Sequence, residues 1–478
     1  MSLRPLGRHD EAMRAYSRVH FVGIGGAGMS GIAEVLATLG YEVSGSDLAE
    51  TSTTLRLQGL GVRVVRGHAA EHVADVDVLV VSSAIAPDNP ELLAAKERRI
   101  PIVPRAEMLG ELMRFRLGIA IAGTHGKTTT TSLVASVLAE GGLDPTYVIG
   151  GLLNSSGSNA RLGQSRYLVA EADESDGSFL LLQPTLAVVT NIDADHLENY
   201  GGDFAQVKRA FAEFLHHLPF YGVAVLCVDD SNTVVLAGET ARKVMTYGFA
   251  ENADVRATNV SQHGATMRFV LHLPGAEARE VELGLPGRHN VQNALAAAAI
   301  AWQLAVPVDA IARAFAGFRG VGRRFHQHGA IEVTGGEALL VDDYGHHPRE
   351  LAAVFAAARG GWPERRLVVA FQPHRYTRTR DLLDDFAEVL ASVDVLVLSE
   401  VYPAGEQPIA NADGKALARA VRTRGRVDPV FVTSVWDLAE TLAPLARADD
   451  LILLMGAGDI GRVAIEIAEA GALPAVTT

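Results

Sequence analysis

The sequence predicts an α/β protein built from several domains, and three observations indicate this class. Short β-branched runs, such as His20 to Val22 and Val76 to Val81, alternate with helical patterns such as Ile32 to Leu39. That alternation is typical of parallel sheets with helical crossovers. An apolar strand runs directly into a glycine turn at three places in the sequence. The length of 478 residues favours about three domains.

Two stretches mark candidate domain boundaries. Residues 100–104 are punctuated by prolines, and residues 317–322 are rich in glycine. Both residue types interrupt regular structure. We therefore predict domains at 1–105, 106–320 and 321–478.

The composition excludes a disordered chain and a basic nucleic-acid binder. Apolar residues make up 48% of the sequence and charged residues 21%, as in globular proteins that bury a large core. The net charge of -14 repels nucleic acid and anionic lipid, although a local basic pocket can still bind an anionic small molecule. We expect small-molecule partners and no nucleic acid.

Cysteine usage and hydropathy indicate where the protein works. Cys227 is the single cysteine and lies in an apolar run, so we expect a buried structural thiol and no disulfide within the chain. Residues 1–10 lack the apolar core of a signal peptide, and no apolar run approaches the roughly 18 residues of a membrane span. These features predict a cytoplasmic protein without membrane insertion.

The segment 123–128 has the composition of a phosphate-binding loop. It reads G-T-H-G-K-T, follows the apolar strand Leu117 to Ala122 and precedes a helical pattern. Its backbone N–H groups would face a phosphate, with Lys127 as a charge for the β and γ groups and the Thr128 hydroxyl on Mg²⁺. Two residues separate its glycines, fewer than in the usual pattern. An ordinary turn is the alternative, which the strand-to-helix context disfavours.

Acidic residues and a histidine follow the next two predicted strands. The run E-A-D-E-S-D follows Tyr167 to Val169, and Glu171, nearest the strand, is the best metal ligand. The strand Leu186 to Thr190 ends in N-I-D-A-D-H-L, which brings Asp193 and His196 to the same edge of the sheet. Because Mg²⁺ prefers oxygen ligands, chemistry alone does not favour His196. For Asp193, structural capping is the alternative.

A glycine turn near the amino terminus has the spacing of a dinucleotide-binding turn. Gly23, Gly25 and Gly28 follow a strand, and Asp47 ends the next strand. The pattern suggests NAD, but the same turn accepts any pyrophosphate, including that of a UDP-sugar.

These motifs together resemble the Mur ligase family, ATP-dependent enzymes that build the peptide of bacterial cell wall precursors. The motifs follow the family's order across nearly the whole chain: G-I-G-G-A-G-M-S-G, G-T-H-G-K-T-T-T, E-A-D-E-S-D, N-I-D-A-D-H-L, G-R-H-N-V-Q-N-A-L-A, D-D-Y-G-H-H-P and F-Q-P-H-R-Y-T-R-T. The resemblance implies a Rossmann-like amino-terminal domain for UDP-N-acetylmuramate, a central P-loop ATPase-like domain for ATP, and a Rossmann-like carboxy-terminal domain for the amino acid.

The resemblance also implies a reaction. Within the family, one member adds L-alanine and another recycles L-Ala-γ-D-Glu-meso-diaminopimelate onto the same sugar nucleotide. The member that adds L-alanine is favoured by the amino-terminal glycine motif, by D-D-Y-G-H-H-P-R-E-L and by Q-P-H-R-Y-T-R-T. The γ-phosphoryl group of ATP would pass to the lactyl carboxylate, and the alanine amine would attack the resulting acyl phosphate. An NAD-binding dehydrogenase and a non-catalytic nucleotide-binding regulator are alternatives of other classes. A dehydrogenase needs no lysine-bearing phosphate loop, and the retained catalytic-type residues disfavour a regulator.

The resemblance and the residue chemistry imply the following roles. The expected catalytic residues are Lys127, Glu171, His196, His346 and Arg375. Mg²⁺, as two ions for which Mn²⁺ can substitute, is expected on Thr128, Glu171 and His196. ATP is expected on Gly123, Thr124, His125, Gly126, Lys127, Thr128, Thr129, Asn290, Asn293 and Asp343. The UDP-sugar is expected on Gly23, Gly25, Gly26, Gly28, Asp47, Ser82, Ser83, His125 and Arg324. The amino acid is expected on Tyr344, His346, Arg375 and Arg378.

Some of these residues have a structural alternative. The amides of Asn290 and Asn293 can pair with adenine, and Asn290 can also cap its helix. His125 is expected to contact the muramate substrate, with a hydrogen-bonded loop histidine as the alternative. Arg324 follows Arg323 at the second boundary, where a plain linker charge pair is the alternative. A homodimer is allowed by the sequence.

Overall fold

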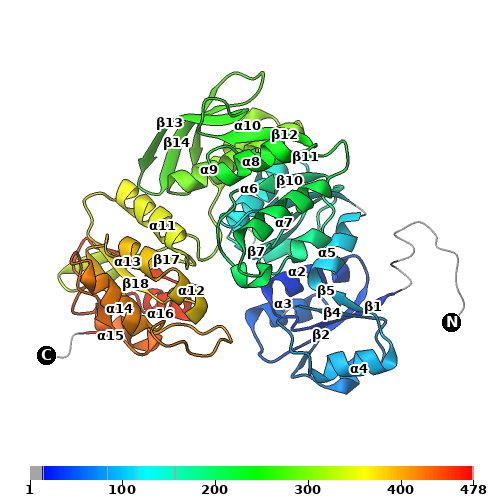
Figure 1. Ribbon diagram of the computed structural model, residues 1–478, viewed down its shortest axis with the longest axis horizontal. Coiled ribbons are helices and arrows are strands. Elements are labelled where there is room, and N and C mark those ends of the chain that lie inside the picture. Colours follow the sequence, from blue (N-terminus) through cyan, green and yellow to red (C-terminus); the bar gives the residue numbers. More distant parts are fainter. Residues whose placement is uncertain (1–12, 14–15, 83, 115, 155–157, 476–478) are drawn as a thin grey trace, which may run out of the picture. The chain divides into compact units, whose positions relative to one another are not determined.

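The computed structural model in Figure 1 describes residue 13 and residues 16–82, 84–114, 116–154 and 158–475. The chain divides into two units. The first contains Met1–Thr258, Val270–Val281 and Gln292–Phe318, and the second contains Asn259–Phe269, Glu282–Val291 and Arg319–Thr478.

The first sheet of the amino-terminal region is parallel, with strand order β3-β2-β1-β4-β5. Its strands are β1 Arg18–Val22, β2 Glu42–Asp47, β3 Arg63–Arg66, β4 Val78–Val81 and β5 Ile102–Pro104. The helices are α2 Ala27–Thr38, α3 Ser52–Gly59, η1 Ala70–Val73, α4 Pro90–Arg98 and α5 Arg105–Arg114. Because β1 lies in the middle of the sheet, the glycine turn that follows it stands beside the end of β2, as the sequence predicts.

The second sheet has strand order β15-β14-β13-β12-β11-β10-β6-β9-β7-β8. Its strands are β6 Leu117–Ala122, β7 Thr146–Leu153, β8 Ser158–Arg161, β9 Tyr167–Glu171, β10 Leu186–Val189, β11 Val223–Cys227, β12 Lys243–Gly248, β13 Val255–His263, β14 Thr266–His272 and β15 Arg279–Leu283. The accompanying helices are α6 Lys127–Glu140, η2 Ser178–Leu181, η3 Leu197–Tyr200, α7 Phe204–His216, α8 Ser231–Glu239, α9 Arg288–Gln303 and α10 Val308–Gly317.

The position of β6 decides what surrounds the phosphate loop. Strand β6 pairs in parallel with β10 on one side and with β9 on the other. The carboxyl ends of parallel strands meet at one edge of a sheet. The acids after β9 and the N-I-D-A-D-H-L segment after β10 therefore flank the loop after β6. Cys227 ends β11 and is buried, as predicted.

The third sheet lies in the second unit and has strand order β16-β17-β21-β18-β19-β20. Its strands are β16 His326–Val333, β17 Gly336–Asp343, β18 Leu367–Phe371, β19 Val395–Leu398, β20 Val430–Phe431 and β21 Leu451–Met455. The helices are α11 Pro348–Gly361, α12 Tyr376–Asp381, α13 Leu383–Leu390, α14 Gly414–Thr423, η4 Val435–Asp437, α15 Leu438–Leu442 and α16 Ile460–Ala470. Only the pairing of β16 with β17 is antiparallel among the pairings described in this sheet.

Both faces of the third sheet are covered. Along β18, Val369 packs into a core with Leu351 of α11 and Phe386 of α13. Its neighbour Val368 packs into a second core with Ile460 of α16. Successive strand residues point to opposite faces, so two buried cores on one strand show that helices cover both faces of the sheet.

The α/β class with parallel sheets is confirmed. The predicted domain boundaries stay predictions. The border at Phe318/Arg319 lies close to the proposed cut near residue 321. The proposed cut near residue 105 lies inside the first unit and stays a prediction. Within the described part of the chain, no helix is both long and apolar enough to cross a membrane.

Candidate active site

The phosphate loop connects β6 to α6, and its glycines are required by geometry. Gly123 has a φ of +130° and Gly126 a φ of +82°, which are conformations that favour glycine. A Cβ atom on Gly126 would stand 2.6 Å from Oδ1 of Asn293, and one on Gly123 would collide with the Thr190 side chain. Thr190 and Asn293 therefore pack against the loop in the space that a side chain at Gly123 or Gly126 would occupy.

Lys127, the first residue of α6, folds back over the loop. Its Nζ donates to the carbonyl oxygen of Gly123 at 2.8 Å and to that of Thr124 at 3.1 Å. It also donates to Oε2 of Glu174 at 2.7 Å. Sequence reasoning recognised the acidic run but assigned no role to Glu174, whose pairing with Lys127 depends on the path of the chain after β9.

The surroundings of Lys127 favour its charged form. Burial lowers the pKa of its ammonium group, but the nearby carboxylates of Glu174, Asp173 and Glu171 outweigh burial and raise it. Burial raises the pKa of Glu174 to about 7, even though Lys127 opposes that rise. The loop thus holds the ammonium group of Lys127 against the Glu174 carboxyl group, whose pKa lies above its ordinary value.

Thr128 and Glu171 lie together, as the sequence implied. The Thr128 hydroxyl donates to Oε1 of Glu171 at 3.0 Å, and the Gly150 N–H donates to Oε2 at 2.8 Å. A hydroxyl and a carboxylate are oxygen donors of the kind that Mg²⁺ prefers. These two residues therefore fit a magnesium ion by their chemistry.

His196 lies after β10 in a left-handed backbone conformation, with a φ of +54°. Its Nε2 is 3.6 Å from Asp195 and its Nδ1 is 3.9 Å from Glu198. Its place at the edge beside the loop agrees with the sequence. Its role as a metal ligand stays a prediction.

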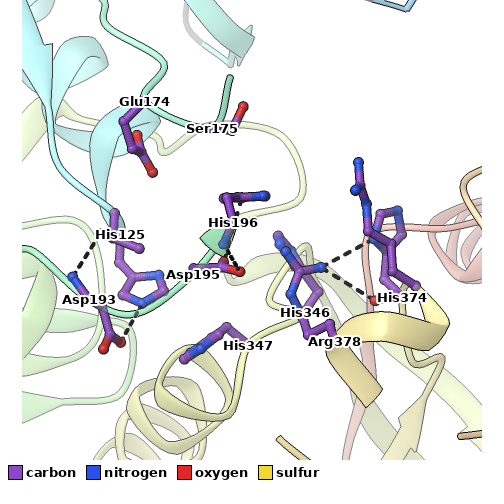
Figure 2. Close-up of polar contacts among 12 residues, drawn as sticks. His125, Glu174, Ser175, Asp193, Asp195, His196, His346, His347, His374 and Arg378 are labelled. Atoms are coloured by element: carbon purple, nitrogen blue, oxygen red, sulfur yellow. Dashed lines mark hydrogen bonds and ion pairs between the residues drawn. The ribbon is translucent and has the colours of Figure 1, made fainter. Parts of the chain in front are cut away.

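His125 is held by residues at the end of β10. Its N–H donates to Oδ1 of Asn191 at 2.9 Å, and its carbonyl oxygen accepts from the Thr190 hydroxyl at 2.6 Å. Its Nε2 is 3.1 Å from Oδ2 of Asp193, and Figure 2 shows the two side chains facing each other. The Asp193 carboxylate therefore orients the His125 ring, a role that sequence reasoning left open.

The two asparagines of α9 are buried. Asn293 accepts from the Thr130 hydroxyl at 3.1 Å, which places it beside α6. Asn290 donates its amide N–H to the carbonyl oxygen of Pro286 at 2.7 Å. Because α9 begins at Arg288, Asn290 is inside the first turn and is not the capping residue. The proposed adenine contacts of both residues stay predictions.

The amino-terminal turn is tied to Asp47. The Gly25 N–H donates to Oδ2 of Asp47 at 2.8 Å, and the Ala49 N–H donates to Oδ1 at 3.2 Å. The Asp47 carboxylate thus stabilises the glycine turn by accepting a hydrogen bond from its backbone. Ser82 follows β4, whereas Ser83, also predicted to bind the UDP-sugar, lies outside the described residues.

Asp343 ends β17 and is buried. Its carboxylate accepts from the N–H groups of Phe325 at 2.7 Å and Gly345 at 2.6 Å. Burial raises its pKa to about 6, although Arg324 opposes the rise. The next residue, Tyr344, has the guanidinium groups of Arg323 and Arg324 over its ring, at 5.0 and 5.1 Å from the ring centre.

We expect Asp343 to make the stability of the protein depend on pH. Its pKa rises from the ordinary 3.8 to about 6 on folding, so the native state binds the proton more tightly than the unfolded state. Stability should therefore fall as pH rises between about 4 and 6. Thermal unfolding midpoints of the wild type and Asp343→Asn, compared across pH 4 to 7, should diverge over that interval. Parallel curves would contradict the prediction.

Of the residues predicted to bind the amino acid, Arg375 and Arg378 follow β18, whereas Tyr344 and His346 follow β17. Arg375 adopts a φ of +71°, a left-handed conformation. Arg378 is buried, and its Nη1 donates to the His374 carbonyl oxygen at 3.3 Å, as Figure 2 shows. His374 stacks on Tyr402 at 5.4 Å between ring centres. His346 has its ring centre 5.6 Å from that of His374.

Sequence reasoning missed His374. The signal was present, because the residue precedes Arg375 in F-Q-P-H-R-Y-T-R-T. Nη1 of Arg378 lies 3.4 Å from Nδ1 of His374, whereas Nη1 of Arg375 lies 3.9 Å from Oε1 of Glu406. Guanidinium groups are suited to carboxylates, and the binding of the amino acid carboxylate by these two arginines stays a prediction.

The parallel sheets and the lysine-bearing loop define an α/β protein of the nucleotide-binding class, and comparison with known families identifies which one. Residues 18–117 match the model "Mur ligase family, catalytic domain". Residues 121–301 match "Mur ligase middle domain", and residues 323–458 match "Mur ligase, glutamate ligase domain". The chain belongs to the Mur ligase family.

Individual members of the family are similar to this chain over nearly its whole length. The chain is 65% identical over 470 residues to the UDP-N-acetylmuramate--L-alanine ligase of Xanthomonas axonopodis pv. citri, covering 98% of each chain. It is 64% identical over 470 residues to the enzyme of that name from Stenotrophomonas maltophilia strain K279a, again covering 98% of each. The crystal structure of UDP-N-acetylmuramate-alanine ligase from Thermotoga maritima is similar with a TM-score of 0.80 at 30% identity, covering 95% of this chain and 98% of that one.

Proposed function

We propose that this chain joins L-alanine to the lactyl carboxylate of UDP-N-acetylmuramate, using ATP and releasing ADP and phosphate, in the synthesis of peptidoglycan precursors. The observation that carries this function is the 65% identity, over 98% of both chains, to a relative named for this ligation. The lysine-bearing loop and the arginine pair after β18 supply chemistry that the reaction needs.

The reaction needs an activated carboxyl group. A lactyl carboxylate oxygen attacks the γ-phosphorus of ATP, the bond to the β-γ bridging oxygen breaks, and ADP leaves. The alanine amine then attacks the acyl carbon, loses a proton, and phosphate departs with the electrons of the broken C–O bond. Positioning and charge neutralisation carry most of the catalysis in phosphoryl transfer.

The residues of the loop fit the first step. Lys127, charged and held over the loop, would neutralise the β and γ phosphates. Thr128 and Glu171 would hold Mg²⁺, which supplies Lewis-acid stabilisation of phosphate oxygens when bound. A second ion on His196 and Glu171, and Mn²⁺ as a substitute, belong to the same proposal. Asn290 and Asn293 would contact adenine.

The remaining site residues are assigned by the same reasoning. Gly23, Gly25, Gly26, Gly28 and Asp47 would form the UDP-binding turn, with Ser82, Ser83, His125 and Arg324 as further contacts. Tyr344, His346, Arg375 and Arg378 would bind the amino acid, and Asp343 would contact ATP ribose. Both oxygens of the Asp343 carboxylate already accept a backbone N–H, so a ribose hydroxyl would have to donate to the second lone pair of one of them.

The sequence also suggests the roles of the domains, the cellular location and the assembly. Domains 1–105, 106–320 and 321–478 would bind the sugar nucleotide, ATP and the amino acid in that order. A cytoplasmic location suits an enzyme whose substrates are ATP and a sugar nucleotide. A homodimer is an allowed assembly.

The acceptor decides between two members of the family. Phosphate release would be measured with ATP, Mg²⁺ and UDP-N-acetylmuramate, adding either L-alanine or L-Ala-γ-D-Glu-meso-diaminopimelate. We expect release with L-alanine and none above background with the tripeptide. Release with the tripeptide alone would instead make the chain a recycling ligase. Release with neither would favour a nucleotide-binding regulator.

A further inference from the structure

A buried carboxylate in the amino-terminal region meets three histidines. Glu91, on α4, has no exposed surface. Its Oε1 lies 2.6 Å from Nδ1 of His72 and 3.6 Å from Nε2 of His20. Its Oε2 accepts from the Ser46 hydroxyl at 2.6 Å and lies 3.2 Å from Nδ1 of His68. Nothing in the ligation chemistry above uses this cluster.

The cluster has a defined proton arrangement. Burial raises the pKa of Glu91, but the approach of His20 and the hydrogen bonds with Ser46 and His72 outweigh burial and lower it to about 2. Glu91 is therefore an ionised acceptor, and a histidine nitrogen that bonds to it must carry a proton. For His68 this is Nδ1, which also lies 2.9 Å from the Ser46 hydroxyl oxygen. A neutral His68 then presents Nε2 as an acceptor.

The same cluster is hydrogen-bonded to the edge of the first sheet where we propose that the sugar nucleotide binds. The Ser46 carbonyl oxygen accepts from Gly23 N–H at 2.8 Å and from Ile24 N–H at 3.0 Å, so Ser46 holds the glycine turn after β1. The Gly67 N–H donates to the Asp47 carbonyl oxygen at 2.7 Å, which joins the segment after β3 to the end of β2. Three strand ends thus meet at a network centred on a single buried carboxylate.

His68 and His72 are the two members of the network that reach solvent, with side chains 16% and 17% exposed, whereas Ser46 and Glu91 are completely buried. Of the two, His68 directly follows Gly67 at the end of β3, while His72 lies farther along the chain in η1. A polar ring at the end of β3, next to Asp47 and the glycine turn, stands where a nucleotide on parallel strand ends is bound.

We infer that Glu91 is a positioning residue of the sugar-nucleotide site and that His68 is a contact residue of it. Glu91 holds the His68 ring so that Nε2 accepts a hydrogen bond from an N–H or O–H donor of the bound nucleotide, such as the imide N–H of uracil. The inference rests on the proposed function, because it requires a uridine nucleotide at this edge.

The test compares dissociation constants for UDP-N-acetylmuramate and for ATP, measured by calorimetry on the full chain. His68→Asn, which leaves no acceptor at the Nε2 position, should weaken the sugar nucleotide by about tenfold, the loss of one hydrogen bond. ATP affinity should not change. His68→Gln, whose amide oxygen can reach the Nε2 position, should recover most of the affinity.

Glu91→Gln should weaken the sugar nucleotide in the same direction, with ATP affinity unchanged. Because Glu91 acts through His68, the double variant should bind no more weakly than His68→Asn alone. Glu97→Gln, which removes an exposed charge from the same helix, is the matched control and should leave both affinities unchanged.

Three outcomes would overturn the inference. Unchanged sugar-nucleotide affinity in folded His68→Asn would remove His68 from the site. Fully additive losses in the double variant would show that Glu91 does not act through His68. A fall in thermal midpoint for Glu91→Gln without any loss of affinity would make the cluster purely structural. If the wild type binds the sugar nucleotide but never ligates, the proposed function fails while these affinities still decide the inference.

Discussion

Replacing Lys127 with methionine is expected to reduce phosphate release from ATP by about 10³-fold or more. The substitution keeps the aliphatic stem but removes the ammonium group that bonds to the loop carbonyl oxygens. The loop would then lack its point charge for the β and γ phosphates. Affinity for UDP-N-acetylmuramate should be largely retained, since most of the residues assigned to that ligand lie in the domain at 1–105.

Methionine at position 127 also leaves Glu174 without its ion-pair partner. The variant Lys127→Met/Glu174→Gln removes both charges and should fold normally while remaining inactive. Lys208→Met, which removes an exposed lysine from α7, is the matched control and should keep full activity. Normal ATP turnover in the folded double variant would exclude Lys127 from the catalytic set.

The second large effect is expected from Gly123→Ala. The φ of +130° at this position strains any residue with a Cβ, and that atom would collide with the Thr190 side chain. Strain and overpacking together should cost about 2 to 6 kcal/mol. Because the Gly123 carbonyl oxygen also binds Nζ of Lys127, ATP affinity should fall with stability.

The matched control for this substitution is Gly142→Ala. Gly142 also has a positive φ, +78°, but no atom lies within 4 Å of the Cβ position. It should cost only the backbone strain of about 1 to 2 kcal/mol, with ATP affinity unchanged. Thermal unfolding and ATP titration of both variants would check this. Equal losses at the two positions would contradict the role assigned to the Thr190 contact.

Local patterns in the sequence predicted much of the site. The phosphate loop could be found because its glycines, lysine and threonine are consecutive, and the flanking strand and helix each have their own period. Glu171 could be chosen because it ends its strand, and the ends of parallel strands share an edge. The contact between Thr128 and Glu171 agrees with that choice.

Contacts between distant segments were harder to foresee. Glu174 was one of several acids in its run, and only the fold shows which acid reaches Lys127. His125 and Asp193 are separated by 68 positions, and their pairing depends on β10 lying beside β6. Glu91 has no motif around it, because a buried carboxylate is recognised by its partners and not by its neighbours in sequence.

The sequence by itself determined the parallel α/β class, the position of the nucleotide-binding loop and the family. Each of these depends on hydrophobic periodicity or on consecutive residues whose backbone must meet a phosphate. Only the tertiary structure decided the partner of Lys127, the support of the amino-terminal turn by Asp47 and Ser46, and the burial of Asp343. Burial and ion pairing depend on which segments pack together. The free energy of packing arises from contacts between residues far apart in the chain, which local sequence patterns do not reveal.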